Sequence, residues 1–398
     1  MTGRLDADIE PVLHAAMTLV ARGGLKALSL RPLADQLGST VSALTHRFGR
    51  KEALLGSLID AAHADDAAFL DHWLVRACAL NVHNGALLAD LADAVLADMA
   101  GPESLRTQFL CELLQGAVSR PDIAAPLAAW RARRLSFWCA LAEALGHADL
   151  GEALHAFSTD EAAHGLALGP LSPYRWLRRL TLQRLCGGLV APLGSTDLKQ
   201  FGVFHAALGD LPDLADRYRT PQMSEWQAGA AHHISALILA EGADAVTHRA
   251  VAARANLPNS SLAYHFPRQE DLLLAGLHDI IGRMQGAIYG SASSEITSES
   301  ELTSVEIARA TFAIALVATR MPGLATFAAD MRRRRGENYL VRLNSRVSGR
   351  DPFDLLSAQT IAMVGNGQLV LDAVLAPAAD AAAARLTGQL QAIVLATD

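Results

Sequence analysis

The chain contains one segment twice. Residues 24–55 superpose on residues 242–273 without a gap, at a constant offset of 218 positions in a chain of 398 residues. Eleven positions are identical: Gly24/Gly242, Ala27/Ala245, Arg31/Arg249, Ala34/Ala252, Ser42/Ser260, Leu44/Leu262, Phe48/Phe266, Arg50/Arg268, Glu52/Glu270, Leu54/Leu272 and Leu55/Leu273. Such a period is far too long for a solenoid repeat and matches a whole domain pair. The sequence therefore predicts two subunits fused head to tail, so that the chain is its own partner.

The composition favours a large all-helical protein. The chain is 51% hydrophobic but only 5% aromatic, and alanine and leucine dominate it. No apolar stretch reaches the length of a membrane span and no signal peptide is recognisable, so we expect a cytoplasmic protein without membrane contact. Four widely spaced cysteines without C-x-x-C argue against a zinc cluster or a disulfide framework. The net charge of -7 does not indicate a nucleic-acid partner, so local charge must decide that point.

The first copy predicts three helices in quick succession. Residues 9–20 carry an apolar helical stripe that ends at a Gly-Gly pair. Ser29 is expected to cap a short second helix, and Ser39 or Thr40 a third helix over residues 41–48. Two short helices joined by a tight turn form a helix-turn-helix.

The second copy repeats each step. Thr247 is expected to cap its second helix, and residues 260–266 form its third. Asn256 stands where the first copy has its turn glycine, and Asn is the side chain that best replaces Gly at positive φ.

Both copies resemble the N-terminal pattern of the tetracycline-repressor (TetR) family of bacterial transcription regulators. The pattern G-x-x-x-x-[ST]-x-x-x-[IVL]-A, then L-x-x-x-F, then K-x-x-L-L, is matched by Ser29, Leu33-Ala34, Leu44 with Phe48, and Lys51 with Leu54-Leu55, and again by Thr247, Val251-Ala252, Leu262 with Phe266, and Leu272-Leu273. The family usually has Tyr directly after the leucine of the recognition helix. Here that position is Thr45 or Ala263, and Tyr264 follows one step later.

The resemblance implies a subunit of one DNA-binding head and a larger helical domain that binds ligand and dimerises. We therefore expect an all-α tandem TetR-like pseudodimer with two helix-turn-helix heads on two helical ligand-binding/dimerisation domains. The expected domains are a first head at residues 1–60, a first helical domain at 61–218, a second head at 219–284 and a second, shortened helical domain at 285–398.

A recognition helix places small and polar side chains against base edges, while basic groups and helix N-termini hold phosphates. The first head offers Ser42, Thr45, His46 and Arg47 for the groove and Ser29, Arg31, Thr40 and Lys51 for the backbone. The second head offers Asn259, Ser260, Ser261, Tyr264 and His265 for the groove and Thr247, Arg249 and Arg268 for the backbone.

Charge separates the heads. Residues 22–52 hold six basic and two acidic side chains, whereas residues 240–270 hold three of each. Because phosphate neutralisation supplies most nonspecific affinity, we expect the first head to bind DNA more tightly.

Other residues carry weaker signals. Five aromatic side chains could line an effector pocket, or simply fill the core: Trp130, Phe137, Trp138, Phe157 and Trp176. The run Arg332 to Arg335 is expected on a hydrated or interdomain face. Glu161 and His164 have metal-ligand spacing but no firm third ligand, so no metal is predicted, and the side chains around them are expected at the surface or lining a pocket. Gly365-x-Gly367 indicates close helix contact.

The expected function is a DNA-binding transcriptional repressor that leaves an imperfectly palindromic operator when a small apolar effector binds. We expect no cofactor, and no enzyme, because the chain lacks G-x-S-x-G, P-loop and H-E-x-x-H motifs. Further dimerisation of pseudodimers stays open. The alternative is a ligand-sensing adaptor that has lost specific DNA binding and acts through a protein partner.

Overall fold

The computed structural model describes residues 9–118, 120–189, 194–211, 223–289, 304–337, 340, 353–375 and 379–395. Every regular element among them is a helix, so the all-α prediction is confirmed. The predicted domain boundary after residue 218 lies outside these residues. None of the described helices has the length and apolar character that a membrane crossing requires.

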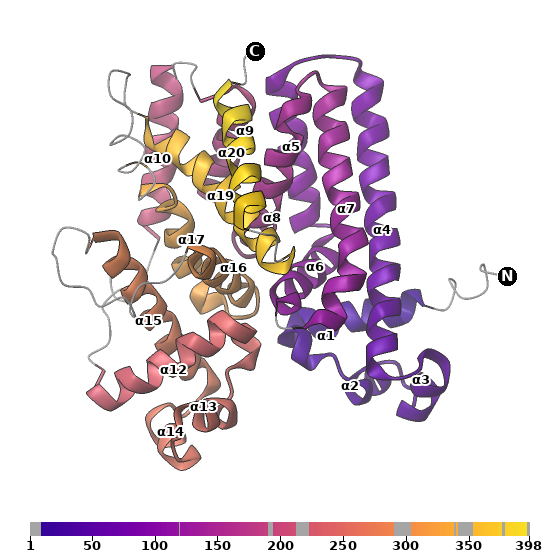
Figure 1. Ribbon diagram of the computed structural model, residues 1–398, viewed down its shortest axis with the longest axis vertical. Coiled ribbons are helices and arrows are strands. Elements are labelled where there is room, and N and C mark those ends of the chain that lie inside the picture. Colours follow the sequence, from indigo (N-terminus) through magenta and orange to yellow (C-terminus); the bar gives the residue numbers. More distant parts are fainter. Residues whose placement is uncertain are drawn as a thin grey trace.

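The helices of the first half form a head and a tall bundle (Figure 1). They are α1 (Glu10–Ala27), α2 (Leu30–Gln36), α3 (Val41–Phe48), α4 (Lys51–Leu80), α5 (Gly85–Ala100), α6 (Ser104–Ala117), α7 (Pro121–Ala144), the short η2 (Ala148–Leu150), α8 (Gly151–Leu168), α9 (Ser172–Cys186) and α10 (Ser195–Gly209). The 30 residues of α4 continue from the head into the bundle, where α4 packs along α7.

The second half repeats the three-helix array, with fewer helices behind it among the residues that the structure describes. They are α12 (Glu225–Glu241), η3 (Ala243–Ala245), α13 (His248–Ala255), α14 (Asn259–His265), α15 (Gln269–Tyr289), α16 (Ser304–Arg320), η5 (Pro322–Leu324), α17 (Ala325–Arg333), α19 (Leu355–Leu375) and α20 (Ala379–Leu395).

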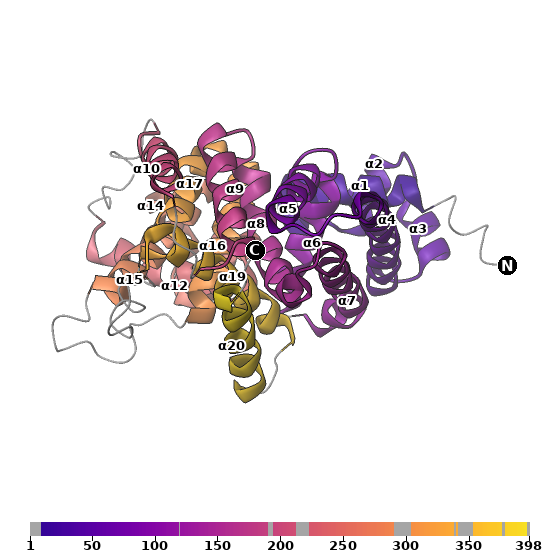
Figure 2. The same cartoon turned by 90° about the horizontal axis from the view of Figure 1, so that it is seen from above.

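The two halves meet along α8 and α19, which lie between the first-half bundle and the second-half helices in both views (Figures 1 and 2). Gly367 of α19 allows this approach, because a Cβ there would lie 1.8 Å from the carbonyl oxygen of Ala156 on α8. The prediction of close helix contact at Gly367 is therefore confirmed.

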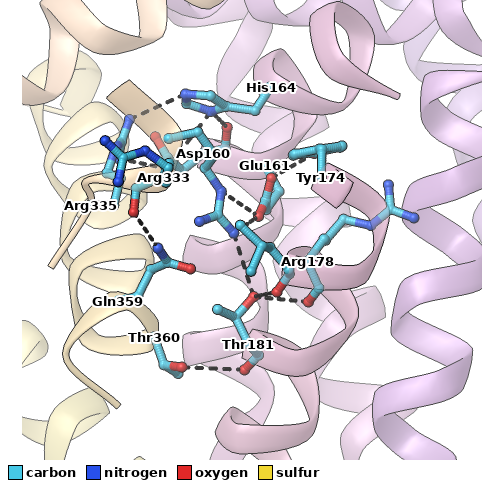
Figure 3. A network of polar contacts seen from close by, with 12 residues as sticks. Asp160, Glu161, His164, Tyr174, Arg178, Thr181, Arg333, Arg335, Gln359 and Thr360 are labelled. Carbon is cyan, nitrogen blue, oxygen red and sulfur yellow. Dashed lines mark hydrogen bonds and ion pairs between the residues drawn. The ribbon is translucent and has the colours of Figure 1, made fainter. Parts of the chain in front are cut away.

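Buried ion pairs also join the halves (Figure 3). Arg332 of the second half is fully buried and its Nη2 donates to Glu161 Oε1 of α8 at 2.5 Å. Arg335 Nη1 donates to Asp160 Oδ2 at 2.7 Å, and the Tyr174 hydroxyl donates to Glu161 Oε2. Burial acts to raise the pKa of Glu161, but the charges of Arg332 and His164 and the hydrogen bonds from Arg332 and Tyr174 together outweigh it, and the pKa lies below its ordinary value. The carboxylate therefore stays charged between the halves.

This network decides one prediction and corrects another. Of the two faces expected for the arginine run, Arg332 and Arg335 lie on the one between the halves and are not hydrated, because Glu161 and Asp160 from the other half neutralise them. His155 and His164, expected at the surface or in a pocket, are buried in α8. Among the described residues no group of three or more His, Cys, Asp or Glu side chains could hold a metal ion.

Candidate nucleic-acid interface

The first head is built as a helix-turn-helix on α1. The helical geometry of α1 breaks at Gly23 and Gly24, where Gly24 takes a φ of 67°. Its buried stripe Val12, Leu13, Ala16 and Val20 belongs to the same core cluster as Leu33 of α2 and Leu44 of α3. Thr40 caps α3 as predicted, because its Oγ1 accepts from the Ala43 N–H at 3.1 Å.

Ser29 precedes α2, but its hydroxyl makes no capping hydrogen bond. Its position at the N-cap agrees with the prediction, but the side-chain bond is absent, and Pro32 at the third helical position removes one of the two possible donors. A cap accepts from the N–H of the second or third residue, and proline has no N–H to donate.

The third helix of the first head presents a polar surface. Leu44 is its single buried side chain, whereas Ser42, Thr45, His46 and Arg47 are all exposed. Arg47 lies 5.0 Å from the centroid of the Phe48 ring, and the Thr45 hydroxyl donates to the Val41 carbonyl. A groove-reading helix needs this arrangement, in which the apolar anchor faces the head and the hydrogen-bonding groups face outward.

The residues of the first head that were predicted to contact the DNA backbone lie on two surfaces, the outside of the head and a cleft. Arg31 and Thr40 are exposed, and Ser29 is half-buried. Lys51, at the start of α4, is half-buried and lines a cleft between the two heads.

The second head has the same order of helices. Thr247 caps α13 by accepting from the Ala250 N–H at 3.1 Å, and Asn256 ends that helix with a φ of 52°. Both observations confirm the sequence predictions for these residues. On α14, Leu262 is buried and Tyr264 is 80% exposed.

The remaining predicted contacts of the second head vary in accessibility. Asn259, Ser260 and His265 are exposed, as are Thr247 and Arg249 near the start of α13, and Ser261 is half-buried. The His265 ring lies 4.4 Å from that of Trp226 on α12.

Two residues of the second head hold it together in a way that sequence reasoning missed. His248 Nε2 lies 2.6 Å from the Phe266 carbonyl oxygen, and Gln269 Nε2 donates to the Val246 carbonyl at 2.8 Å. The repeat itself carried the signal, because the aligned residues of the first head are Leu30 and Lys51. Where the first head has Leu30 and Lys51, the second head has His248 and Gln269, whose side chains contact backbone carbonyls of other segments.

The second head also holds less free positive charge than its sequence indicates. Arg268 pairs with Asp271 at 3.0 Å and with Glu270 at 3.6 Å. The hydrogen bond from Arg268 lowers the pKa of Asp271, so the pair stays charged at neutral pH. A phosphate would have to compete with these carboxylates for the Arg268 guanidinium.

The five aromatic residues that could line a ligand pocket or fill the core do not lie together. Trp130, Phe137, Trp138 and Phe157 are fully buried, but Trp130 belongs to a different core cluster from the other three. Trp130 Nε1 donates to Asp66, and Trp176 is 40% exposed and stacks on Phe204. As a set they are core and surface residues of the first half.

Comparison with known proteins agrees with the first head. Residues 12–58 match the family model of bacterial regulatory proteins, tetR family. This match supports a TetR-family regulator. The TetR-type segment runs from α1 into α4 and includes the exposed α3, so it implies DNA binding at this head. No curated protein matches the chain.

Proposed function

We propose that the chain is a one-component transcription regulator, a repressor, whose two heads bind the two halves of one operator. The observation that carries the proposal is the joint placement of α3 and α14. Each has its leucine buried and polar side chains exposed, and the two heads lie at the same end of the molecule (Figure 1). Paired recognition helices need a common end, because they enter successive major grooves about 34 Å apart.

Internal repetition supports the tandem arrangement. The segments share eleven identities and one order of helices. Farther along, Pro121 recurs as Pro322 at an offset of 201, and the same offset relates Leu168 of α8 to Leu369 of α19. In the proposed arrangement the two helices that join the halves would be the equivalent helices of the two copies, as in the isologous contact of a homodimer.

The spacing of the two heads would also explain how an effector releases the protein from DNA. A small effector that favours a different spacing of the heads would disfavour simultaneous contact with both grooves. A coupling free energy of about 1–3 kcal/mol between effector and operator is typical of such regulators.

The test is selection of bound fragments from the source genome, followed by fluorescence anisotropy on the recovered sequence at two salt concentrations. We expect sequence-selective binding that weakens steeply with salt, because phosphate contacts release counterions. Equal affinity for the selected and a scrambled fragment would overturn the proposal. Absence of DNA binding, with capture of a protein partner instead, would establish the adaptor alternative.

A further inference from the structure

A cleft with a volume of about 490 Å³ lies between the two heads. One wall comes from the end of α1, the start of α4 and α6 of the first half. The other comes from the end of α12, η3 and α16 of the second half. Its volume falls within the range of small-molecule sites, about 300–1,000 Å³.

The cleft is electropositive. Its charged lining residues are the basic Lys26, Lys51, Arg120 and Arg320 and the acidic Glu112 and Glu241. Arg320 forms an ion pair with Glu112 across the halves, and Arg120 pairs with Asp122. Within the described part of the chain Lys26 and Lys51 form no ion pair, and the acidic lining residue Glu241 offsets one of them. The cleft therefore keeps one excess positive charge to attract an anion.

An unpartnered donor lines the same cleft. Gln115 of α6 is only 6% exposed, and its Nε2 has no hydrogen-bond partner among the described residues. A buried amide N–H without an acceptor carries the full cost of desolvation, and a carboxylate oxygen would satisfy it with a charge-assisted bond.

The other lining residues are apolar. Leu25 stands on the first-half wall and Ala313, Leu316 and Val317 on the second-half wall. A ligand that fits both surfaces therefore needs a negative head and a hydrocarbon body.

We propose that the cleft binds a small amphipathic carboxylate, with its head at Lys26, Lys51 and Gln115 and its hydrocarbon part against Leu316 and Val317. The ligand would touch both halves where α1 packs against η3 and α16. Binding there changes the spacing of the heads and makes the carboxylate the effector, a consequence that rests on the proposed function, whereas the site itself does not.

The site is tested by isothermal titration of the full-length protein with octanoate, with the neutral octanamide of equal length as control. We expect octanoate to bind and octanamide to bind at least about tenfold more weakly, since a hydrogen bond to a charged group contributes more than one to a neutral group. Equal binding of the two compounds, or no binding of octanoate at millimolar concentration, would overturn the proposal. Binding of inorganic phosphate without octanoate would also overturn it.

Variants locate the ligand. Lys26→Met and Gln115→Leu should each weaken octanoate binding by about tenfold, and Gln115→Glu should abolish it by placing like charges together. The matched control is Lys199→Met on α10, which lies away from the cleft and should leave binding unchanged. Unchanged affinity in both Lys26→Met and Gln115→Glu, with wild-type helicity and Tm, would place the ligand elsewhere.

The regulatory step has a separate readout. Octanoate should lower the affinity of the wild-type protein for its selected operator by about fivefold or more, and Gln115→Glu should lose this response. If the protein does not bind DNA at all, the proposed function fails while the titration still decides the site. If octanoate binds in the cleft but leaves DNA affinity unchanged, its role as effector is wrong.

Discussion

Arg332 and Glu161 join the halves through a side-chain contact with both partners fully buried. Arg332→Ala should destabilise the protein by about 3–5 kcal/mol, because it leaves the Glu161 carboxylate buried without its counter-charge. Arg133→Ala is the matched control, since its pair with Asp71 is largely exposed and should contribute about 0–1 kcal/mol. Urea unfolding followed by circular dichroism measures both. Equal losses in the two variants would contradict the assignment of the stability to this buried pair.

His155 makes the stability depend on pH. Burial lowers its pKa from 6.5 to about 3, and the charges of Arg134 and Arg131 act in the same direction. Between these two pH values the unfolded chain therefore binds a proton at His155 that the folded chain does not bind. This contribution is complete above pH 6.5 and declines as the pH falls toward 3, by about 1.4 kcal/mol per pH unit.

The variant His155→Gln should consequently lose less stability than wild type between pH 7.5 and 5.5. The comparison is the change in Tm of each protein between these two pH values. Some loss should remain in the variant, because burial also lowers the pKa of His164. A wild-type Tm that rises on acidification would show that the sign is wrong.

At the same scale, the sequence predicted local features better than buried charges. The caps at Thr40 and Thr247 and the left-handed Asn256 depend on neighbours within three or four residues, so the pattern was sufficient. The burial of Arg332 depends on Glu161, 171 residues away, and no local pattern contains that contact.

At the scale of the elements, the close approach of α19 to α8 depends on Gly367. Gly367→Ala should force α19 away from α8, because its Cβ would overlap the Ala156 carbonyl, and we expect a loss of at least about 3 kcal/mol. Gly56→Ala in α4 is the matched control. It meets nothing within 4 Å and should stabilise the helix by about 1 kcal/mol. Thermal unfolding of both variants checks the prediction, and a stable Gly367→Ala protein would refute the close packing.

The two reading heads should contribute unequally to DNA affinity. Replacing Arg47 and Lys51 with alanine should weaken operator binding and reduce its salt dependence more than replacing Arg249 and Arg268, because Arg268 already pairs with Asp271 and Glu270. Anisotropy titrations at two salt concentrations compare the double variants. Equal losses would refute this ranking of the heads.

The helices of both heads were predictable because α1 and α12 each bury a regularly spaced apolar stripe, and α3 and α13 begin at threonine caps. α8 was harder to interpret, since it is buried on nearly every side and its Asp160 and Glu161 bind arginines from the other half. The cleft was also beyond prediction, because its two walls come from segments about 200 residues apart, and packing places them opposite each other.

At the scale of the whole molecule, the proposed fusion of two unlike halves would free each head to change independently. A homodimer presents two identical recognition helices and so requires a symmetric operator. In this chain α3 offers Thr45, His46 and Arg47, whereas α14 offers Ala263, Tyr264 and His265 at the aligned positions. Different side chains at the same places in the groove should prefer different bases.

One chain should therefore bind one asymmetric operator, and symmetrising that operator should weaken binding. Two synthetic sites test this: one carries the first-head half-site twice and the other carries the second-head half-site twice. On each site one of the two heads meets bases that it does not prefer. Every mismatched base pair costs about 1–3 kcal/mol, so each symmetrised site should bind at least about tenfold more weakly than the natural one. Anisotropy gives the affinities, and light scattering of the complexes gives the number of chains. If the site with two first-head half-sites binds more tightly and recruits two chains, the first heads of separate chains pair on DNA, and the fused pair does not act as the reading unit.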